Sequence, residues 1–176
     1  MIRHIVALAL SLLLIGPAHA AGGAVELIKR DWSFNGPFGT FDKASMQRGF
    51  QVYREVCAGC HSMKYIAFRN FADLGYNEAE IKALAAEYDV EDGPNDDGEM
   101  FMRPGIPADR IPSPYPNDNA ARAGNGGALP PDLSLIAKAR ANGPDYLYSL
   151  IVGYKDAPSD IEVPDGMYYN NAYSGN

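Results

Sequence analysis

The sequence is poor in cysteine, histidine and basic residues. Its 176 residues include two cysteines and three histidines, and two cysteines are too few for a disulfide-dense scaffold. There are 15 Lys and Arg against 22 Asp and Glu, so the formal net charge is −7 at pH 7. An acidic chain is poorly suited to nucleic acid, whose phosphates need a basic face, and it favours a basic protein partner.

Long apolar runs are also scarce. The longest, residues 5–15, is interrupted only by Ser11 and is too short for a membrane anchor, which needs roughly 20 apolar residues. It follows the basic Arg3 and precedes Ala18-His19-Ala20, an order that predicts a secretory signal peptide over residues 1–20. We expect the mature chain, residues 21–176, to be one domain that works outside the cytoplasm.

Glycine, proline and apolar residues are plentiful. The chain has 18 Gly and 13 Pro, and 47% of its residues are hydrophobic. This content is ample for a core and predicts a loop-rich fold with modest secondary structure. No segment shows the sustained alternation of a β-strand, and the proline-rich residues 102–116 predict an extended loop.

Two segments in the first half carry helix signals. Asp42 predicts the start of a helix over residues 43–56, because its carboxylate can accept hydrogen bonds from first-turn amides. One face of this helix is apolar at helical spacing and leads into the cysteines: Met46, Phe50, Tyr53 and Cys57. A second helix is expected after Asn77, which forms a capping-box pattern with Glu80. Its buried side is expected to consist of Ile81, Leu84 and Ala85.

Two further helices are expected towards the end of the chain. One follows Asp132 and stops at Asn142-Gly143. Its buried side is expected to consist of Leu133, Ile136 and Ala137. The other has Pro144 in its first turn. Its apolar residues recur at helical spacing: Leu147, Leu150, Ile151 and Tyr154.

Residues 57–61, Cys-Ala-Gly-Cys-His, match the C-x-x-C-H pattern of covalent c-type haem attachment. Two thiols three positions apart on a turn can each add to one vinyl group of the same porphyrin. The adjacent His61 is then presented to the iron. A hydrogen bond from its second ring nitrogen to a backbone carbonyl would set the orientation of the ring.

Three other uses of Cys57 and Cys60 remain open from the motif alone. A disulfide between them can form outside the cytoplasm, although such a short loop is strained and stabilises little. A redox dithiol is typical of a βαβ pattern, which the sequence does not show. A zinc site needs further ligands, and His61 is the only histidine of the expected mature chain.

The motif belongs to a longer set of segments that resembles the cytochrome c1 family in its bacterial form. The set is highly specific, because its members occur in a fixed order over most of the expected mature chain. It consists of residues 31–34 (DWSF), 48–53 (RGFQVY), 57–65 (CAGCHSMKY), 102–104 (MRP), 112–117 (PSPYPN), 120–123 (AARA), 127–134 (GALPPDLS) and 166–170 (GMYYN).

The resemblance implies a mainly α c-type cytochrome fold, with several helices and long Pro/Gly-rich loops around one covalently bound haem c. Cys57 and Cys60 would hold the haem through thioethers, and His61 would be an axial ligand of the iron. No catalytic acid, base or nucleophile is implied, because the haem subunit carries electrons and transforms no substrate itself.

Two further segments have roles implied by the resemblance. Arg122 resembles an arginine that pairs with a haem propionate, and a solvated surface arginine is the alternative. Leu129, Pro130 and Pro131 resemble a segment that packs against the haem face, where proline leaves no amide unsatisfied. A simple turn before the helix at Asp132 explains the same three residues.

The family also implies partners. The subunit would take electrons from the Rieske iron–sulfur protein, beside cytochrome b, within a quinol:cytochrome c oxidoreductase of a respiratory or photosynthetic chain. It would pass them to a soluble basic cytochrome c at the periplasmic face of the bacterial inner membrane. A ligand-binding or peroxidase-like c-type haem protein is the alternative function.

One departure from the family pattern concerns the second axial ligand. The methionine ligand of the family follows the Gly-Met-Tyr-Tyr-Asn segment, and a C-terminal membrane anchor comes later still. The sequence reaches Asn176 before either feature, and its methionines do not occupy the matching position. We therefore expect residues 21–176 to lack the sixth-ligand segment and the anchor of a complete cytochrome domain.

Acidic residues dominate residues 78–99. Nine stand against the single basic residue Lys82: Glu78, Glu80, Glu87, Asp89, Glu91, Asp92, Asp96, Asp97 and Glu99. This pattern is typical of a solvated surface. It would also serve as an electrostatic guide for a basic cytochrome c, whose brief encounters depend on the association rate.

Overall fold

The computed structural model describes residue 25 and residues 27–173. The signal peptide predicted over residues 1–20 lies outside the described residues. Two compact units are formed: one is Lys29–Asp145, and the other combines the segment up to Ile28 with the segment from Tyr146. None of the described helices is both long enough and apolar enough to cross a membrane.

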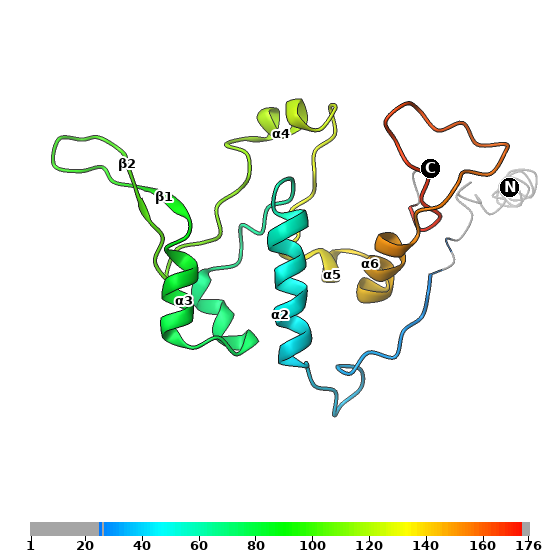
Figure 1. The fold of residues 1–176 in the computed structure, drawn as a ribbon, viewed down its shortest axis with the longest axis horizontal. Helices are drawn as coiled ribbons and strands as arrows, with labels where there is room; N and C mark the ends of the chain where they lie inside the picture. Colours follow the sequence, from blue (N-terminus) through cyan, green and yellow to red (C-terminus); the bar gives the residue numbers. More distant parts are fainter. Residues whose placement is uncertain (1–24, 26, 174–176) are drawn as a thin grey trace, which may run out of the picture. The chain divides into compact units, whose positions relative to one another are not determined.

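The larger unit is mainly helical, as predicted (Figure 1). Its elements are α2 (Lys43–Val52), the π-helix η1 (Tyr53–Cys57), the 3₁₀ helix η2 (Phe68–Leu74), α3 (Glu78–Ala85), β1 (Asp89–Asp92), β2 (Phe101–Pro104), α4 (Asp118–Gly124) and α5 (Ile136–Ala139). The last helix, α6 (Gly143–Val152), begins at the end of this unit and continues into the smaller one.

The helix predicted over residues 43–56 forms in two parts. Asp42 caps α2 as predicted, because its Oδ1 accepts a hydrogen bond from the amide of Ser45 at 2.6 Å. After Val52 the backbone widens into η1, where the amide of Ala58 donates to the carbonyl of Tyr53 at 2.8 Å. Such π-turns are frequent at functional sites, and this one ends at Cys57.

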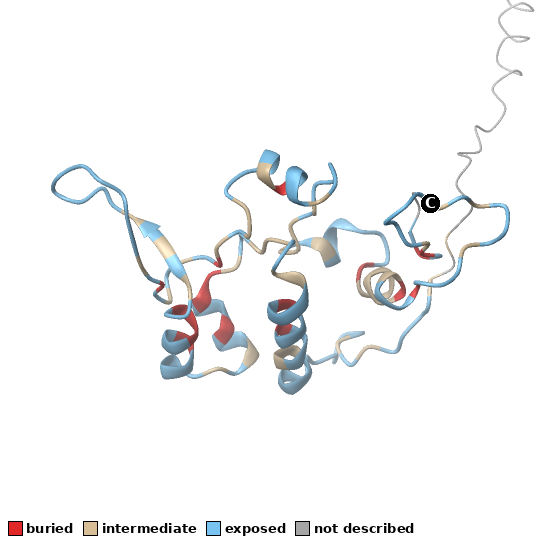
Figure 2. Cartoon of the chain, turned by 45° about the horizontal axis from the view of Figure 1, so that its top comes forward, coloured by how far each residue is buried: buried red, intermediate tan, exposed pale blue. Residues whose placement is uncertain are grey.

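The hydrophobic core lies where η2 packs against α2 and α3 (Figure 2). Phe68 is fully buried, and the centroid of its ring lies 5.2 Å from that of Tyr88. Phe50 of α2 meets Phe71 of η2 with their ring centroids 4.3 Å apart. The other core side chains are Tyr53, Ile81, Leu84, Ala85 and Ile111. This core fixes the end of α2 from which the cysteine motif starts.

The capping box predicted at the start of α3 is confirmed. The side chain of Asn77 accepts from the amide of Glu80 at 3.0 Å, and Glu80 Oε2 accepts from the amide of Asn77 at 2.8 Å. The predicted buried side is also confirmed, since Ile81, Leu84 and Ala85 are all buried. The preceding η2 was not predicted, and it ends at Gly75, whose φ of 96° suits glycine.

The prediction for the helix after Asp132 is wrong in its bounds and in its buried side. The helix forms only as α5, which ends at Ala139, before Asn142-Gly143. Leu133 and Ile136 are half-buried, and Ala137 is exposed. The side chain of Asp132 explains the delay, because its Oδ1 accepts the amide of Ser134 at 3.0 Å. A local bond of this kind competes with the first helical turn.

Two more predictions need correction. α6 forms where it was expected, but Ile151 and Tyr154 are 72% and 61% exposed. Helical spacing alone does not say whether a second element covers the apolar face.

The strand pair β1–β2 was missed, and β2 takes the first residues of the predicted extended loop. Its two four-residue strands are largely exposed on both faces, so they need no apolar alternation.

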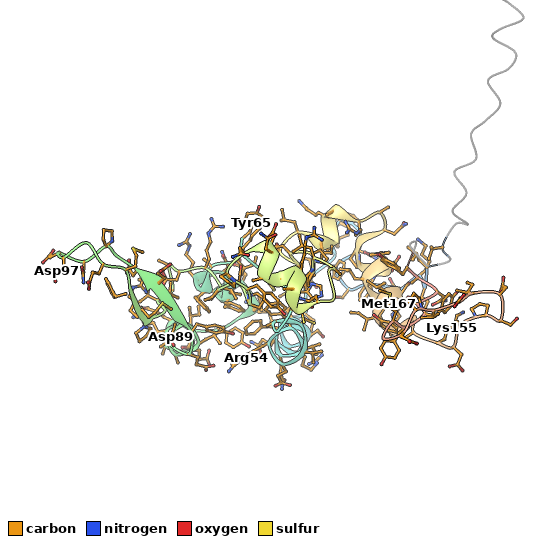
Figure 3. The ribbon with its side chains drawn as sticks, turned by 90° about the horizontal axis from the view of Figure 1, so that it is seen from above. Arg54, Tyr65, Asp89, Asp97, Lys155 and Met167 are labelled. Atoms are coloured by element: carbon orange, nitrogen blue, oxygen red, sulfur yellow. The ribbon has the colours of Figure 1, made fainter. Side chains whose placement is uncertain are left out.

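The β1–β2 hairpin projects from the larger unit (Figure 1). Asp89 lies at its base and Asp97 in its loop (Figure 3). Arg103 anchors the base, because its guanidinium pairs with Asp92 and donates to both carboxylate oxygens of Asp109 at 2.6 and 3.1 Å.

We predict that the hairpin loosens in acid through this cluster. Hydrogen bonds from Arg103 hold the pKa values of Asp92 and Asp109 below the ordinary value of about 3.9. Because the folded-state pKa values are lowered, the two carboxylates stabilise the hairpin above about pH 4, and this stabilisation is lost as the pH falls through the folded-state values. Hairpin amide exchange, corrected for intrinsic rates, should therefore accelerate more steeply on acidification in the wild type than in Asp109→Asn. Identical profiles would contradict the prediction.

Candidate functional site

Residues 57–61 form a tight turn at the end of η1. The carbonyl of Cys57 accepts hydrogen bonds from the amides of Cys60 and His61, at 3.1 and 2.8 Å. Tyr53 donates from its hydroxyl to the carbonyl of His61 at 3.1 Å. Burial raises the pKa of Tyr53 to about 12, so the hydroxyl keeps its proton and remains a donor at neutral pH. The turn is therefore held by bonds from its own backbone and from the core.

Both sulfurs on this turn are free thiols, with Cys57 half-buried and Cys60 exposed. Among the described residues, no three or more His, Cys, Asp and Glu side chains are grouped so as to share a metal ion, which the zinc alternative would need. Covalent haem attachment needs only the two thiols and one imidazole from this turn.

The ring of His61 is oriented by a residue far along the chain. Its Nδ1 lies 2.8 Å from the carbonyl oxygen of Pro131, 70 residues later. A carbonyl oxygen can only accept, so Nδ1 carries the proton and donates it. In the neutral ring Nε2 is then unprotonated, and its lone pair can bind a metal. The hydrogen bond predicted for the second ring nitrogen is present.

Asp132 joins the segment after the motif to the segment that contains Pro131. Its Oδ2 accepts from the hydroxyl of Ser62 at 2.7 Å and from the amide of Lys64 at 2.9 Å, and its Oδ1 accepts from the amide of Ser134. Partial burial acts to raise the pKa of Asp132, but these hydrogen bonds outweigh it and lower the pKa below its usual range. The carboxylate is thus ionised at neutral pH.

A cavity of about 170 Å³ adjoins Cys60. Leu129 and Pro130 line it together with Ala121 of α4 and Tyr115. Polar side chains also line this cavity, among them Ser62, Lys64 and Asp118, so Leu129 and Pro130 form only an apolar patch of its wall. The fit to a c-type haem rests on the two thiols and the imidazole of the turn. The structure therefore brings together five of the predicted site residues at the motif: Cys57, Cys60, His61, Leu129 and Pro130.

The other two predicted site residues lie close by in different settings. Pro131 is exposed and offers its carbonyl to His61. Arg122 in α4 is exposed, and its Nη1 donates to the carbonyl of Gly127 at 3.1 Å. No carboxylate of the described residues forms an ion pair with Arg122, so its pairing with a propionate stays a prediction.

Sequence reasoning missed two residues that hold the site. Tyr53 was predicted only as an apolar residue of a helical face. Its hydroxyl could have indicated a hydrogen-bonding role, because phenylalanine would pack equally well at this position. Asp132 was predicted only as the start of a helix. No sequence signal connects Asp132 to residues 62–64, because these contacts are made across 68 to 70 residues of chain.

The structure divides the acidic residues of 78–99 into paired and unpaired groups. Glu78 pairs with Lys82 at 2.6 Å, Glu87 with Arg54 and Asp92 with Arg103. Six others are exposed and make no ion pair within the described part of the chain. One of them, Glu80, caps α3 by accepting from the amide of Asn77. The other five, here called the hairpin acids, are Asp89, Glu91, Asp96, Asp97 and Glu99. The uncompensated negative charge is therefore concentrated on the hairpin.

Comparison with known proteins gives consistent matches. The model of the Cytochrome C1 family matches residues 32–176. Cytochrome c1 of Rhodospirillum rubrum is 55% identical over 159 residues, covering 90% of this chain and 58% of that protein. The mitochondrial heme protein cytochrome c1 1 of Arabidopsis thaliana is 49% identical over 166 residues, covering 94% and 54%. Cytochrome b/c1 of Bradyrhizobium diazoefficiens is 47% identical over 180 residues, covering 90% and 26%. The chain spans about half the length of the first two relatives and a quarter of the third.

Removal of the Tyr53 hydroxyl should weaken the fold at the motif. We predict that Tyr53→Phe lowers the free energy of unfolding by about 1 kcal/mol, because the His61 carbonyl loses its side-chain donor. The matched control is Tyr154→Phe at a 61% exposed position, which should change the unfolding free energy by less than about 0.5 kcal/mol. Urea denaturation measures both, and equal losses in the two variants would argue against the prediction.

Proposed function

Because the chain belongs to the cytochrome c1 family, whose members are c-type haem proteins, we propose that it forms the haem-bearing part of an electron-transfer subunit in a cytochrome bc1 complex. The observation that carries this proposal is the state of His61. Its Nδ1 is bonded to the Pro131 carbonyl, so Nε2 is the ring nitrogen left to bind a metal, on the same turn as two free thiols.

Cys57 and Cys60 attach the porphyrin in this proposal. Each thiol would add its S–H across one vinyl C=C bond, with sulfur going to one carbon and hydrogen to the other and no net oxidation. His61 would hold the iron through Nε2, and the haem would supply reversible one-electron transfer.

The remaining residues hold these three in place. Tyr53 fixes the backbone of His61, Pro131 fixes its ring, and Leu129 and Pro130 line the cavity beside Cys60. A ligand held this firmly needs little rearrangement when the charge on the metal changes. Arg122 has guanidinium N–H groups beyond the one that binds Gly127, and we propose that they neutralise a haem propionate.

The partners and the compartment follow from the same proposal. We infer that the subunit assembles with cytochrome b and the Rieske iron–sulfur protein and takes electrons from the latter. The name of the matched cytochrome b/c1 protein supports the first partner. We further propose that residues 21–176 form one cytochrome domain after signal cleavage, at the periplasmic face of the bacterial inner membrane. The hairpin acids would receive a soluble basic cytochrome c.

Haem attachment is tested by expression together with a haem-ligation apparatus. The wild type should give a pyridine haemochrome band for two thioethers, and Cys57→Ala with Cys60→Ala should give no covalent haem. Each single variant that retains haem should show a red-shifted band, because one vinyl group stays conjugated with the ring. A colourless wild type with two titratable thiols would overturn the proposed function.

The docking role of the hairpin is tested by charge neutralisation. Conversion of Glu91, Asp96, Asp97 and Glu99 to their amides should slow electron transfer to a basic cytochrome c roughly tenfold at low ionic strength and flatten its salt dependence. The control neutralises the same number of exposed acids elsewhere: Asp156, Asp160, Glu162 and Asp165. If both variants lose rate equally, net charge alone acts and the hairpin is not the docking surface.

A further inference from the structure

Two short segments run together beside the motif, although they are far apart in sequence. The amide of Leu133 donates to the carbonyl of Ser62 at 2.8 Å, and the amide of Tyr65 donates to the hydroxyl of Ser134 at 3.1 Å. Asp132 lies at the centre of this pairing. Its carboxylate accepts Ser62 Oγ and Lys64 N from one segment and Ser134 N from its own.

We propose that Asp132 is the positioning residue of the haem-iron ligand, acting on His61 through the carbonyl of Pro131. The inference rests on the proposed function only in taking His61 as an iron ligand. The carbonyl oxygen that binds His61 Nδ1 belongs to the peptide unit between Pro131 and Asp132. This unit is planar, so its orientation is set by the residues on its two sides.

The two sides of that peptide are constrained differently. On one side, the ring of Pro131 fixes its own φ, so rotation about ψ is the freedom left to aim the carbonyl. On the other side, Asp132 is tied by its carboxylate to Ser62 and Lys64, which directly follow the ligand residue. The Asp132 carboxylate thus connects the peptide of the Pro131 carbonyl, which accepts the His61 ring proton, to the backbone that follows His61.

The contacts of Asp132 are suited to positioning and not to charge pairing. No Lys or Arg of the described residues lies within ion-pair distance of its carboxylate, and every recorded partner is an amide or a hydroxyl. Two of these partners are backbone amides with fixed N–H directions, so they limit where the Asp132 side chain can lie. Removal of the carboxylate would leave the bonds from the Leu133 and Tyr65 amides to support the bond between His61 and Pro131.

The consequence reaches the metal through the His61 ring. A firm Nδ1–H···O=C bond makes the imidazole a stronger electron donor at Nε2, which favours the ferric state. If the Pro131 carbonyl drifts, the ring loses basicity and the reduction potential rises. Asp132 therefore keeps the potential low, although it never touches the iron.

The test uses the full-length holoprotein with Asp132→Ala and with Asp132→Asn, which keeps the size but replaces one acceptor oxygen by a donor. The reduction potential should rise from wild type to Asp132→Asn to Asp132→Ala. The hyperfine-shifted resonances of the His61 ring should move in the same order. Amide exchange at Leu133 should accelerate in the same series.

The control is Asp145→Ala, which also removes a carboxylate with several partners: Arg30 N, Trp32 Nε1 and Lys29 Nζ. It should lower thermal stability but leave the potential and the His61 resonances unchanged. Unchanged values in Asp132→Ala, or equal shifts in Asp145→Ala, would overturn the inference. Should Asp132→Ala fail to accumulate, the same readouts on Asp132→Asn decide.

The two proposals fail differently. If the wild type carries no covalent haem, the proposed function is wrong. If it carries haem and only the Asp132 variants leave the potential and the ring resonances unmoved, the function stands and the positioning role is wrong.

Discussion

The hydrogen bond from His61 Nδ1 to the Pro131 carbonyl is the interaction on which the site depends. Because the acceptor is a carbonyl, the bond determines at once which ring nitrogen carries the proton and where the ring points. The surrounding contacts act on its two ends. Tyr53 secures the backbone of the donor, and Asp132 secures the peptide of the acceptor. A c-type haem motif can therefore present a metal ligand before any metal is bound.

Intramolecular ion pairs determine which acidic residues keep an unpaired negative charge. Arg54 pairs with Glu87 and Lys82 with Glu78, while Arg103 pairs with both Asp92 and Asp109. The hairpin acids keep their charge in full contact with water, where a long-range field acts on an approaching partner but contributes little to folding. Ion pairing thus removes part of the acidic charge around α3 and leaves the hairpin acids, from Asp89 at the base to the loop, as the largest unpaired group.

Local signals in the sequence predicted local structure well. Asp42 and the Asn77–Glu80 pair predicted two helix starts, because capping involves residues three positions apart. Non-local outcomes could not be read in this way. Ile151 has the same spacing as a buried residue but is exposed, and β1–β2 has no apolar alternation because neither strand is buried. The π-turn at Tyr53 is likewise invisible to helical periodicity.

The same holds for the site: the sequence predicted which residues form it but not how they contact one another. Residues 57–61 predicted the thiols and the ligand, and the resemblance implied that Leu129, Pro130 and Pro131 pack against the haem face, which stays a prediction. The contact of Pro131 with His61 is made by a main-chain oxygen, which every residue type possesses, so side-chain patterns carry no trace of it. What proline adds is a fixed φ, and what Asp132 adds is a fixed neighbour. Together they orient the Pro131 carbonyl toward His61. This arrangement comes from the fold and not from the cysteine motif.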